Sequence, residues 1–403
     1  MIRKYIDFSK KPFFAFLQAL IFFFFIPLFS TFFANNIFEK VVYFVLSFLF
    51  AIIIAELLFL FLYRLFTGTN YQVIGKVNFE RLMNEPHPYL PYIYKKNFDG
   101  GRAEQTNYPL HPELKSLPLT TNNLGYFNGE DGSRDIIIPK PKDLIRINCL
   151  GASTTGNYLH VENKVYSYPL ELERILRKKT SKQLEVNNCA QGGYNSADSL
   201  VRFLLKDVDT NPDILIIYHA INDIRSYLTP GFTSDYSHSR KNLGEVYWKF
   251  FIGSKIPNLQ IKFINYLKNK FLFPSSEQYS LLEVIKKGQI DPKMDYTNGL
   301  KTYERNIQHI IDISLRKKIK VVLCTFCMYL YPRIKDDPLQ NLYKKIVSEE
   351  NKILRKLATQ NDLTLVDTAS LIEKSDENFV DAVHFTPKGM RLLAQHIADK
   401  III

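Results

Sequence analysis

Short apolar segments alternate with amphipathic ones from about residue 140 to the C-terminus. The short segments are rich in Ile, Val and Leu, as strands buried on both faces of a parallel sheet are. They lie at residues 145–150, 184–189, 214–219, 320–326 and 363–366. The amphipathic segments have helical spacing and lie at 168–179, 303–317, 339–358 and 387–401. This alternation predicts an α/β domain whose parallel sheet is covered by helices on both faces.

Two longer apolar segments occupy the N-terminal part of the chain, at residues 13–34 and 41–63. Each is long enough to cross a bilayer as a helix, which takes about 20 residues. The first lacks the short apolar core and the small-residue cleavage site of a signal peptide. We therefore expect residues 1–66 to form a membrane hairpin of two transmembrane helices, with two buried core helices as the alternative. Glu56 would face protein or lie near the membrane edge.

The charges that flank the two apolar segments predict an orientation. Cytoplasmic flanks of membrane helices carry an excess of Lys and Arg. We therefore expect both ends of the hairpin, and the domain that follows it, on the cytoplasmic side, which also suits four unpaired thiols. The charges are Arg3, Lys4, Lys10 and Lys11 before the first segment, Glu39 and Lys40 in the link, and Arg64, Lys76 and Arg81 after the second.

Composition divides the rest of the chain. Residues 67–140 are rich in Tyr, Pro, Asn and Gly with little periodicity, which predicts an irregular linker or platform. Residues 141–403 hold the α/β domain, interrupted by an insertion at about 228–300. Within the insertion, residues 246–273 have the pattern of a basic amphipathic helix. Such a helix would lie on a membrane, cover the site as a lid, or pack as an ordinary insertion.

The formal charge of +12 favours an anionic partner, either a nucleic acid or a membrane surface. Lys and Arg are scattered among acids and aromatic residues without a dense basic run, so we expect a membrane surface and no nucleic acid. The four Cys residues are too few for a disulfide framework. Cys324 and Cys327 form a C-x-x-C without a second Cys pair or a His cluster of zinc spacing. We interpret them as structural, with a redox pair or half a zinc site as the alternatives.

Polar and glycine-rich segments follow the predicted strands, at the sheet edge where parallel α/β domains place their active sites. A serine in a glycine-flanked turn can present its hydroxyl outward. Glycines leave backbone N–H groups free to point at a ligand, and these N–H groups and a side-chain amide can bind an oxyanion. The D-x-x-H spacing lets a carboxylate fix the tautomer of an imidazole. Each segment alone is weak evidence for an active site, and their order along the chain strengthens that interpretation. The segments are 151–156 (GASTTG), 190–196 (AQGGYNS), 220–223 (AIND) and 381–384 (DAVH).

In this order the four segments resemble the Ser, Gly, Asn and His blocks of the SGNH (GDSL-like) hydrolases, over about residues 140–403. The segment 121–127 (TNNLGYF) also resembles a lead-in of membrane-linked relatives. Two positions depart from the family pattern. Ala152 replaces the acid of the usual Gly-Asp-Ser, and Ala220 replaces the glycine of the third block. The resemblance implies a flavodoxin-like three-layer sandwich.

The resemblance also implies the site residues. Ser153 would be the nucleophile, His384 the general base and Asp381 the residue that orients it. The N–H groups of Ser153 and Gly193, with the Asn222 amide, would form the oxyanion hole. No metal or organic cofactor is implied, and no substrate-binding residues are identified.

Three further polar residues have open interpretations. His219 would line the site or, more commonly for such a position, be a hydrogen-bonded core histidine. His160 would touch substrate or lie on the surface. Asp223 would brace the loop around Asn222 rather than react.

Three functions remain possible at this stage. The first is a serine esterase or acyltransferase that acts on O-acetyl groups of a bacterial surface glycan or its lipid-linked precursor, at the bacterial inner membrane; this substrate class comes from the membrane-linked relatives. The second is a lipase or thioesterase acting on acyl chains at the membrane. The third is a catalytically silent membrane scaffold. An apolar tunnel would favour lipid and a shallow aromatic and polar cleft would favour sugar. A protein partner stays unnamed.

Overall fold

The computed structural model describes residues 31, 34–67, 83–99, 110–111, 114–116, 120–161, 164–239 and 290–403. The chain divides into two compact units. One contains the helix α2 (Ile37–Thr67), and the other contains every described residue from 83 onward.

The second unit is built on a five-stranded parallel sheet with the strand order β10-β9-β8-β4-β7. Counted along the chain, this is the order 2-1-3-4-5 of flavodoxin-like folds, with β8 at the centre. All described residues of β8 are buried, as a strand covered on both faces requires. The strands are β4 (Leu144–Gly151), β7 (Gln183–Asn188), β8 (Ile214–Tyr218), β9 (Lys320–Cys324) and β10 (Thr364–Val366).

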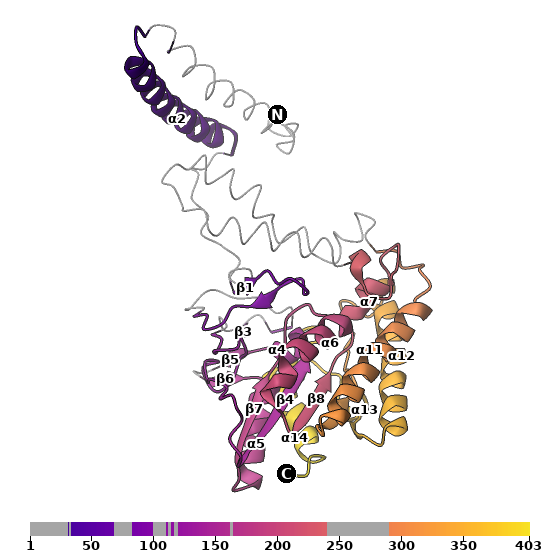
Figure 1. The fold of residues 1–403 in the computed structure, drawn as a ribbon. Coiled ribbons are helices and arrows are strands. Elements are labelled where there is room, and N and C mark those ends of the chain that lie inside the picture. The colour runs from indigo at the N-terminus through magenta and orange to yellow at the C-terminus, as the bar shows by residue number, and fades with distance from the viewer. Residues whose placement is uncertain are drawn as a thin grey trace. The chain divides into compact units, whose positions relative to one another are not determined.

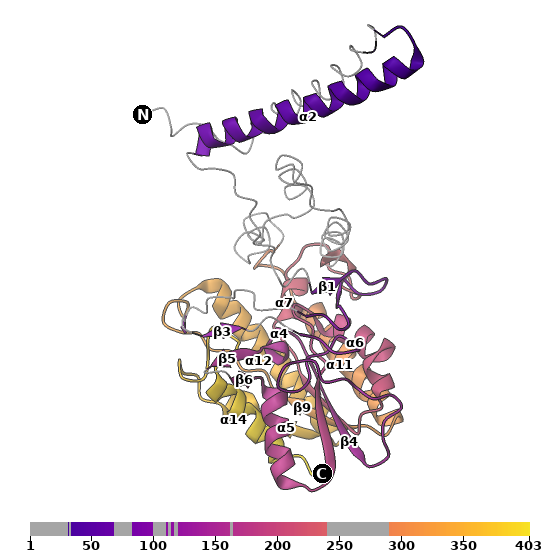
Figure 2. The same cartoon turned by 90° about the vertical axis from the view of Figure 1, so that its left-hand side faces the viewer.

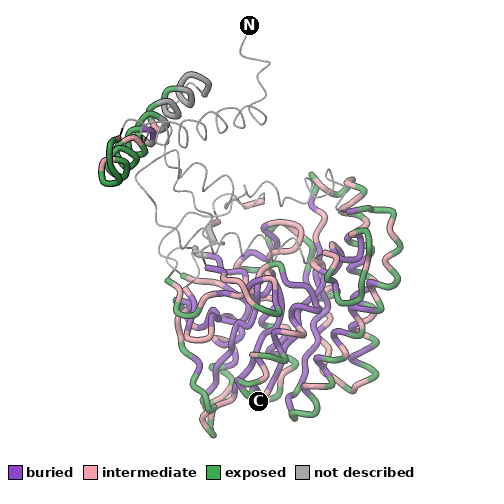
Figure 3. Tube along the Cα trace, turned by 45° about the horizontal axis from the view of Figure 1, so that its top comes forward, coloured by how far each residue is buried: buried purple, intermediate pink, exposed green. Residues whose placement is uncertain are grey.

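Helices cover the sheet in two layers (Figures 1 and 2). One layer pairs α5 with α14, and the other holds α6, α11 and α12, of which α11 packs against both neighbours. Buried residues fill the interior between the layers (Figure 3). The long helices are α5 (Tyr168–Lys179), α6 (Ser196–Leu205), α11 (Thr297–Arg316), α12 (Pro338–Gln360) and α14 (Pro387–Ala398). The short ones are α4 (Ser153–Gly156), η3 (Asp207–Thr210), α7 (Asn222–Tyr227) and α13 (Thr368–Leu371).

The predicted α/β architecture is confirmed, and its strands and helices lie close to the predicted segments. The largest difference is at the start of α11, which begins at Thr297 rather than at 303. The sequence analysis also missed α6. This helix begins with a capping box in which the Asn195 side chain accepts from the Asp198 N–H and the Asp198 side chain accepts from the Asn195 N–H.

The described parts of 83–140 are irregular but packed. They contain a two-stranded sheet of β1 (Asn84–Glu85) and β2 (Ile93–Tyr94), while β3 (Lys115–Ser116) joins β5 (Leu159–Val161) and β6 (Lys164–Tyr166). The side-chain oxygen of Asn122 accepts hydrogen bonds from the N–H groups of Leu124 and Tyr126. Tyr126 is fully buried, and its hydroxyl donates to Asp207.

The helix α2 exposes many of its apolar side chains, for example Phe38 at 77% and Phe61 at 63%. Yet no helix in the described ranges combines the length and the apolar character needed to span a membrane. The predicted transmembrane helix at 41–63 is therefore not supported. The predicted helix at 13–34 lies outside the described residues except for 31 and 34, as does the amphipathic helix predicted at 246–273.

A buried polar network joins β4 and the edge strand β7 to their surroundings. Arg146 of β4 is fully buried and pairs across the sheet with Glu185 of β7. Its guanidinium also donates to the carbonyls of Thr210 and, at 2.9 Å, Ile137. One side chain thus ties β4 to β7, to η3 and to the segment before the sheet.

We predict that Arg146→Met lowers the free energy of unfolding by about 3–5 kcal/mol, because it leaves the Glu185 carboxylate buried without its partner. Urea unfolding at neutral pH measures the change. Lys179→Met is the matched control, since its ion pair with Asp399 is about half exposed on both sides and exposed pairs contribute little. Equal losses in the two variants would contradict the assignment of Arg146 as the buried tie.

Candidate functional site

Ser153 lies in the tight turn between β4 and α4. The carbonyl of Ala152 accepts from the N–H groups of Thr155 (3.0 Å) and Gly156 (2.9 Å), which closes the turn. Gly151 is required there, because a Cβ would overlap Thr155 and lie 2.6 Å from the Tyr218 carbonyl. Ser153 itself is partly exposed. The turn therefore presents its hydroxyl at the carboxyl edge of the sheet, as predicted.

His384 and Asp381 meet Ser153 across 231 positions of sequence. The His384 Nε2 lies 3.1 Å from the Ser153 Oγ, and its Nδ1 lies 2.7 Å from the Asp381 Oδ2. Because a carboxylate only accepts, Nδ1 carries the proton and Nε2 is left to accept from the serine hydroxyl. The three side chains form one continuous hydrogen-bonded chain.

The backbone around His384 fixes this geometry. The other carboxylate oxygen, Asp381 Oδ1, accepts from the N–H groups of Val383 and His384, both at 2.8 Å. The Val380 N–H donates to the His384 carbonyl (2.9 Å), which closes the turn. Thr386 then caps α14 by accepting from the Gly389 N–H. The D-x-x-H segment is thus held rigidly at the start of a helix.

The pKa of Asp381 is lowered from its ordinary value of 3.8. Burial is the largest single influence and would raise the pKa. The attraction and hydrogen bond of His384, together with the two backbone N–H donors, outweigh it. The carboxylate therefore stays ionised at neutral pH, as a group that stabilises an imidazolium must.

Gly193 lies in the loop after β7, which is tied to the Ser153 turn. The Gln191 N–H donates to the Gly151 carbonyl (3.2 Å), and the Asn188 amide donates to the Thr155 carbonyl (3.0 Å). Gly193 is exposed with φ +79°. Among the described residues no hydrogen bond uses its N–H as donor. This N–H is therefore available to a ligand.

Asn222 is the first residue of α7, and its amide donates to the Tyr194 carbonyl at 2.9 Å. The amide has a second N–H, which is a further donor. Since Tyr194 follows Gly193 directly, this bond links the Gly and Asn segments. The structure thus joins Ser153, His384 and Asp381 directly, and joins Gly193 and Asn222 to each other through Tyr194.

His219 is buried, and neither ring nitrogen has a hydrogen-bond partner within the described residues. Burial lowers its pKa to about 4, so the ring is neutral. Its Nδ1 lies 3.5 Å from the Asp223 carboxylate. His219 is therefore a core histidine, although the expected hydrogen bond is not formed. The side chain of His160 lies outside the described set.

Asp223 braces the loop as expected. Its carboxylate accepts from the Ser196 N–H at 2.9 Å and from the Tyr236 hydroxyl at 3.0 Å. Behind it, the buried Glu350 accepts from the Tyr227 hydroxyl (2.8 Å). Burial raises the pKa values of both acids. The mutual repulsion of the two carboxylates raises that of Glu350 further, so the neutral acid is favoured there.

All four cysteines are buried and free, and burial raises the pKa of the Cys327 thiol to about 11. Cys327 donates from its Sγ to the Thr368 carbonyl at 3.0 Å. These contacts give Cys324 and Cys327 a packing role. In the part of the chain that the structure describes, no group of three or more His, Cys, Asp or Glu side chains is arranged to hold a metal ion.

Two tyrosines of the segment 83–99 contact the Gly193 loop and were not predicted. The Tyr92 hydroxyl donates to the Gly192 carbonyl (2.6 Å), and the Tyr94 hydroxyl accepts from the Gly192 N–H (2.9 Å). The one sequence feature that could have pointed to these tyrosines was the Tyr- and Pro-rich composition of this segment.

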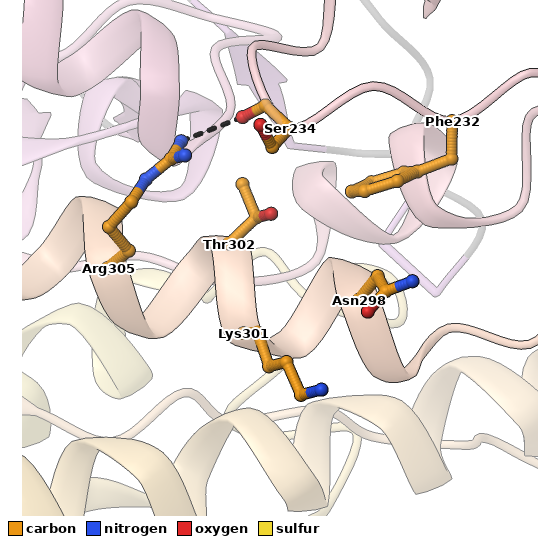
Figure 4. Close-up of a pocket in the computed structure, with 6 residues that line it drawn as sticks. All are labelled: Phe232, Ser234, Asn298, Lys301, Thr302 and Arg305. Atoms are coloured by element: carbon orange, nitrogen blue, oxygen red, sulfur yellow. Dashed lines mark hydrogen bonds between the residues drawn. The ribbon is translucent and has the colours of Figure 1, made fainter.

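A separate pocket of about 370 Å³ opens beside the N-terminal half of α11 (Figure 4). The Arg305 guanidinium donates to the Ser234 carbonyl at its edge (2.7 Å). None of the predicted site residues lines it. Its lining residues are Phe232, Ser234, Asn298, Lys301, Thr302 and Arg305.

Comparisons with known proteins identify the family. Residues 149–392 match the model of the GDSL-like lipase/acylhydrolase family, which covers the Ser, Gly, Asn and His segments. No curated protein matches the chain.

Similar solved structures include an acetylxylan esterase from Geobacillus stearothermophilus, at 14% identity and a TM-score of 0.41 over 64% of this chain and 94% of that one. A GDSL-like lipase from Bacteroides thetaiotaomicron has 13% identity and a TM-score of 0.37 over 65% and 90%. A lipase/acylhydrolase from Enterococcus faecalis has 16% identity and a TM-score of 0.36 over 64% and 95%. The family match spans more than half of the sequence, and the chain is accordingly a member of the GDSL-like lipase/acylhydrolase family, an enzyme that hydrolyses ester bonds.

Proposed function

We propose that the enzyme is a serine esterase in which Ser153 attacks the ester carbonyl, His384 takes the serine proton and Asp381 holds the imidazole. The observation that carries this is the hydrogen-bonded chain from Ser153 Oγ through both His384 nitrogens to Asp381 Oδ2, at 3.1 and 2.7 Å. The protonated His384 then gives the proton to the leaving alcohol. Water, or another hydroxyl in an acyl transfer, attacks the acyl-enzyme in the second half of the reaction.

The developing oxyanion would be bound by the N–H groups of Ser153 and Gly193 and by the Asn222 amide. Gly193 is exposed, and its N–H has no hydrogen-bond partner among the described residues, which supports this role, as does the second amide hydrogen of Asn222. Such donors act strongly because they are already oriented before charge develops.

O-acetyl groups on a glycan or glycolipid are the substrate we favour. Aromatic side chains adjoin the His384 turn, where the Tyr329 N–H donates to the Ala382 carbonyl at 2.8 Å. The Tyr329 ring lies 5.5 Å from that of Phe379 and 6.3 Å from that of Tyr331. Phe379 and Tyr331 are buried, and the partly exposed Tyr329 ring that they support suits the apolar face of a sugar. A lipase or thioesterase on longer acyl chains is the second candidate, supported by the exposed apolar side chains of α2.

We also propose that residues 1–66 hold the enzyme at a bacterial inner membrane, with the catalytic domain on the cytoplasmic side. The apolar composition of 13–34 and 41–63 and the flanking basic residues support this. Recovery of the full chain in the carbonate-washed membrane fraction is expected. In right-side-out vesicles, protease should reach the catalytic domain only after the vesicles are opened. Release of the chain by carbonate would contradict a hairpin.

We predict that a fluorophosphonate probe labels the wild-type protein, does not label Ser153→Ala, and labels His384→Ala very little. The reagent needs a serine oxygen activated by a neighbouring base. Gel fluorescence of the purified full chain measures the labelling, with matched circular dichroism spectra as the control for folding. Labelling that survives Ser153→Ala, or no labelling of folded wild type, would favour the silent scaffold.

Chain-length preference separates the two substrate classes. We expect 4-nitrophenyl acetate to be hydrolysed with a kcat/KM at least about tenfold higher than 4-nitrophenyl decanoate, because a site for acetyl groups gains nothing from added methylenes. Acetylated and lipid esters then extend the series. A preference for the decanoate would favour the lipase or thioesterase hypothesis over the acetylesterase hypothesis.

We predict that Asp381→Asn lowers kcat by about 10³- to 10⁴-fold through the wrong imidazole tautomer. It should also change stability in a pH-dependent way. The depressed pKa of Asp381 stabilises the folded state above the ordinary value of 3.8, and this contribution disappears as pH falls through the depressed pKa. The difference in free energy of unfolding between wild type and Asp381→Asn should therefore shrink below about pH 4. Urea titrations at pH 7 and pH 3.5 measure it, and a difference that grows on acidification would contradict the assignment.

A further inference from the structure

Tyr92 lies 100 positions before Gly192 in the sequence, yet its hydroxyl donates a 2.6 Å hydrogen bond to the Gly192 carbonyl. Tyr92 is 6% exposed and directly precedes β2. Its own carbonyl accepts from the Tyr194 hydroxyl, and the two rings lie 5.7 Å apart. The tyrosine is thus held at both ends against the Gly193 loop.

The carbonyl that Tyr92 contacts belongs to the same peptide unit as the Gly193 N–H. In a planar trans peptide the C=O of one residue and the N–H of the next point in opposite directions. A donor fixed on the Gly192 carbonyl therefore fixes the direction of the Gly193 N–H on the other side of the unit. A hydrogen bond to the carbonyl also polarises the peptide and strengthens its N–H as a donor, by about 10–30%.

The Tyr92 hydroxyl also lies close to the Cα of Gly193. A Cβ at Gly193 would lie 2.5 Å from the Tyr92 hydroxyl oxygen, whereas the next ring atom, Cζ, would be 3.8 Å away. The Tyr92 hydroxyl occupies the space of a side chain at 193. The φ of +79° separately favours glycine there.

Tyr94 supports the neighbouring peptide unit rather than this one. Its hydroxyl accepts from the Gly192 N–H (2.9 Å), and its backbone N–H donates to the Gln191 side chain (3.0 Å). The segment 83–99 therefore contacts both backbone polar groups of Gly192. Among the described residues, Tyr92 is the one whose side chain bonds to the peptide that carries the Gly193 N–H.

We propose that Tyr92 is a positioning residue for the reaction, which aims and polarises the Gly193 N–H toward the oxyanion. This inference rests on the proposed function of Gly193 as an oxyanion donor. It extends the catalytic apparatus to residues 83–99, which lie before the segment matched by the family model.

The test is Tyr92→Phe, which removes the hydroxyl and keeps the ring. The control is Tyr158→Phe, because the Tyr158 hydroxyl also donates at 2.6 Å to a backbone carbonyl, that of Phe127, and the side chain is equally buried at 5%. Hydrolysis of 4-nitrophenyl acetate by the full chain is divided by the number of active sites, counted by saturating fluorophosphonate labelling.

We expect Tyr92→Phe to lower kcat per labelled site by about tenfold, less than the loss of a whole oxyanion donor. The KM should stay within about twofold, and the acidic limb of the pH profile should not move because the Ser153–His384–Asp381 chain is untouched. Tyr158→Phe should keep the wild-type kcat per labelled site.

A kcat per labelled site within twofold of wild type in Tyr92→Phe would overturn the proposal while leaving the Ser153 mechanism intact. A shifted acidic limb, an equal loss in Tyr158→Phe, or the failure of Tyr92→Phe alone to fold would do the same. Full activity of Ser153→Ala would instead remove the proposed function, and this inference with it.

A double-variant cycle checks the contact itself by thermal unfolding. Gly193→Ala should destabilise the wild-type background more than the Tyr92→Phe background, because only in the former does the new methyl group meet the hydroxyl. Equal destabilisation in the two backgrounds would show that the hydroxyl does not lie against Gly193, and would overturn the proposal.

Discussion

The parallel pairing of β4 with both β7 and β8 is the constraint on which the rest of the structure depends. The register places Cys149 beside Asn188 and Gly151 beside Tyr218, so β4 and β8 end together and β7 ends two positions earlier. Their following loops therefore emerge at one edge and carry Ser153, Gly193 and Asn222. Without this shared edge, residues 29 to 69 positions apart would have no reason to form one site.

Hydrogen bonds between buried polar side chains hold this edge in place where apolar packing would not. Asn187 of β7 donates to Asn148 of β4 at 3.0 Å and accepts from Asn128 at 2.8 Å. On the other side, Asp223 bonds to Ser196, whose hydroxyl accepts from Asn306 of α11 at 2.9 Å. Such networks are directional, so they specify loop geometry as well as contributing stability. The loops that carry the site residues are consequently part of the core rather than appended to it.

The candidate site combines residues from several kinds of local structure. The serine comes from a turn that needs glycine at 151, and the His–Asp pair comes from a turn before a capped helix. The Gly193 N–H, which no described residue accepts, comes from a loop with positive φ. Residues 83–99 complete the loop through the hydroxyls of Tyr92 and Tyr94. A segment that precedes the alternating strands and helices of the α/β domain thus fixes the peptide unit between Gly192 and Gly193.

Local sequence determined the α/β class, the bounds of most strands and helices, and the choice of Ser153, Asp381 and His384 as candidate site residues, because periodicity, turn residues and D-x-x-H spacing are properties of short segments. Tertiary structure alone decided that Tyr92 bonds to Gly192, that Arg146 pairs with Glu185, and that His219 is a neutral core residue without a hydrogen-bond partner among the described residues. These contacts join segments far apart in the chain. Neither partner's local pattern encodes the other, so they exist only once the sheet has brought them together.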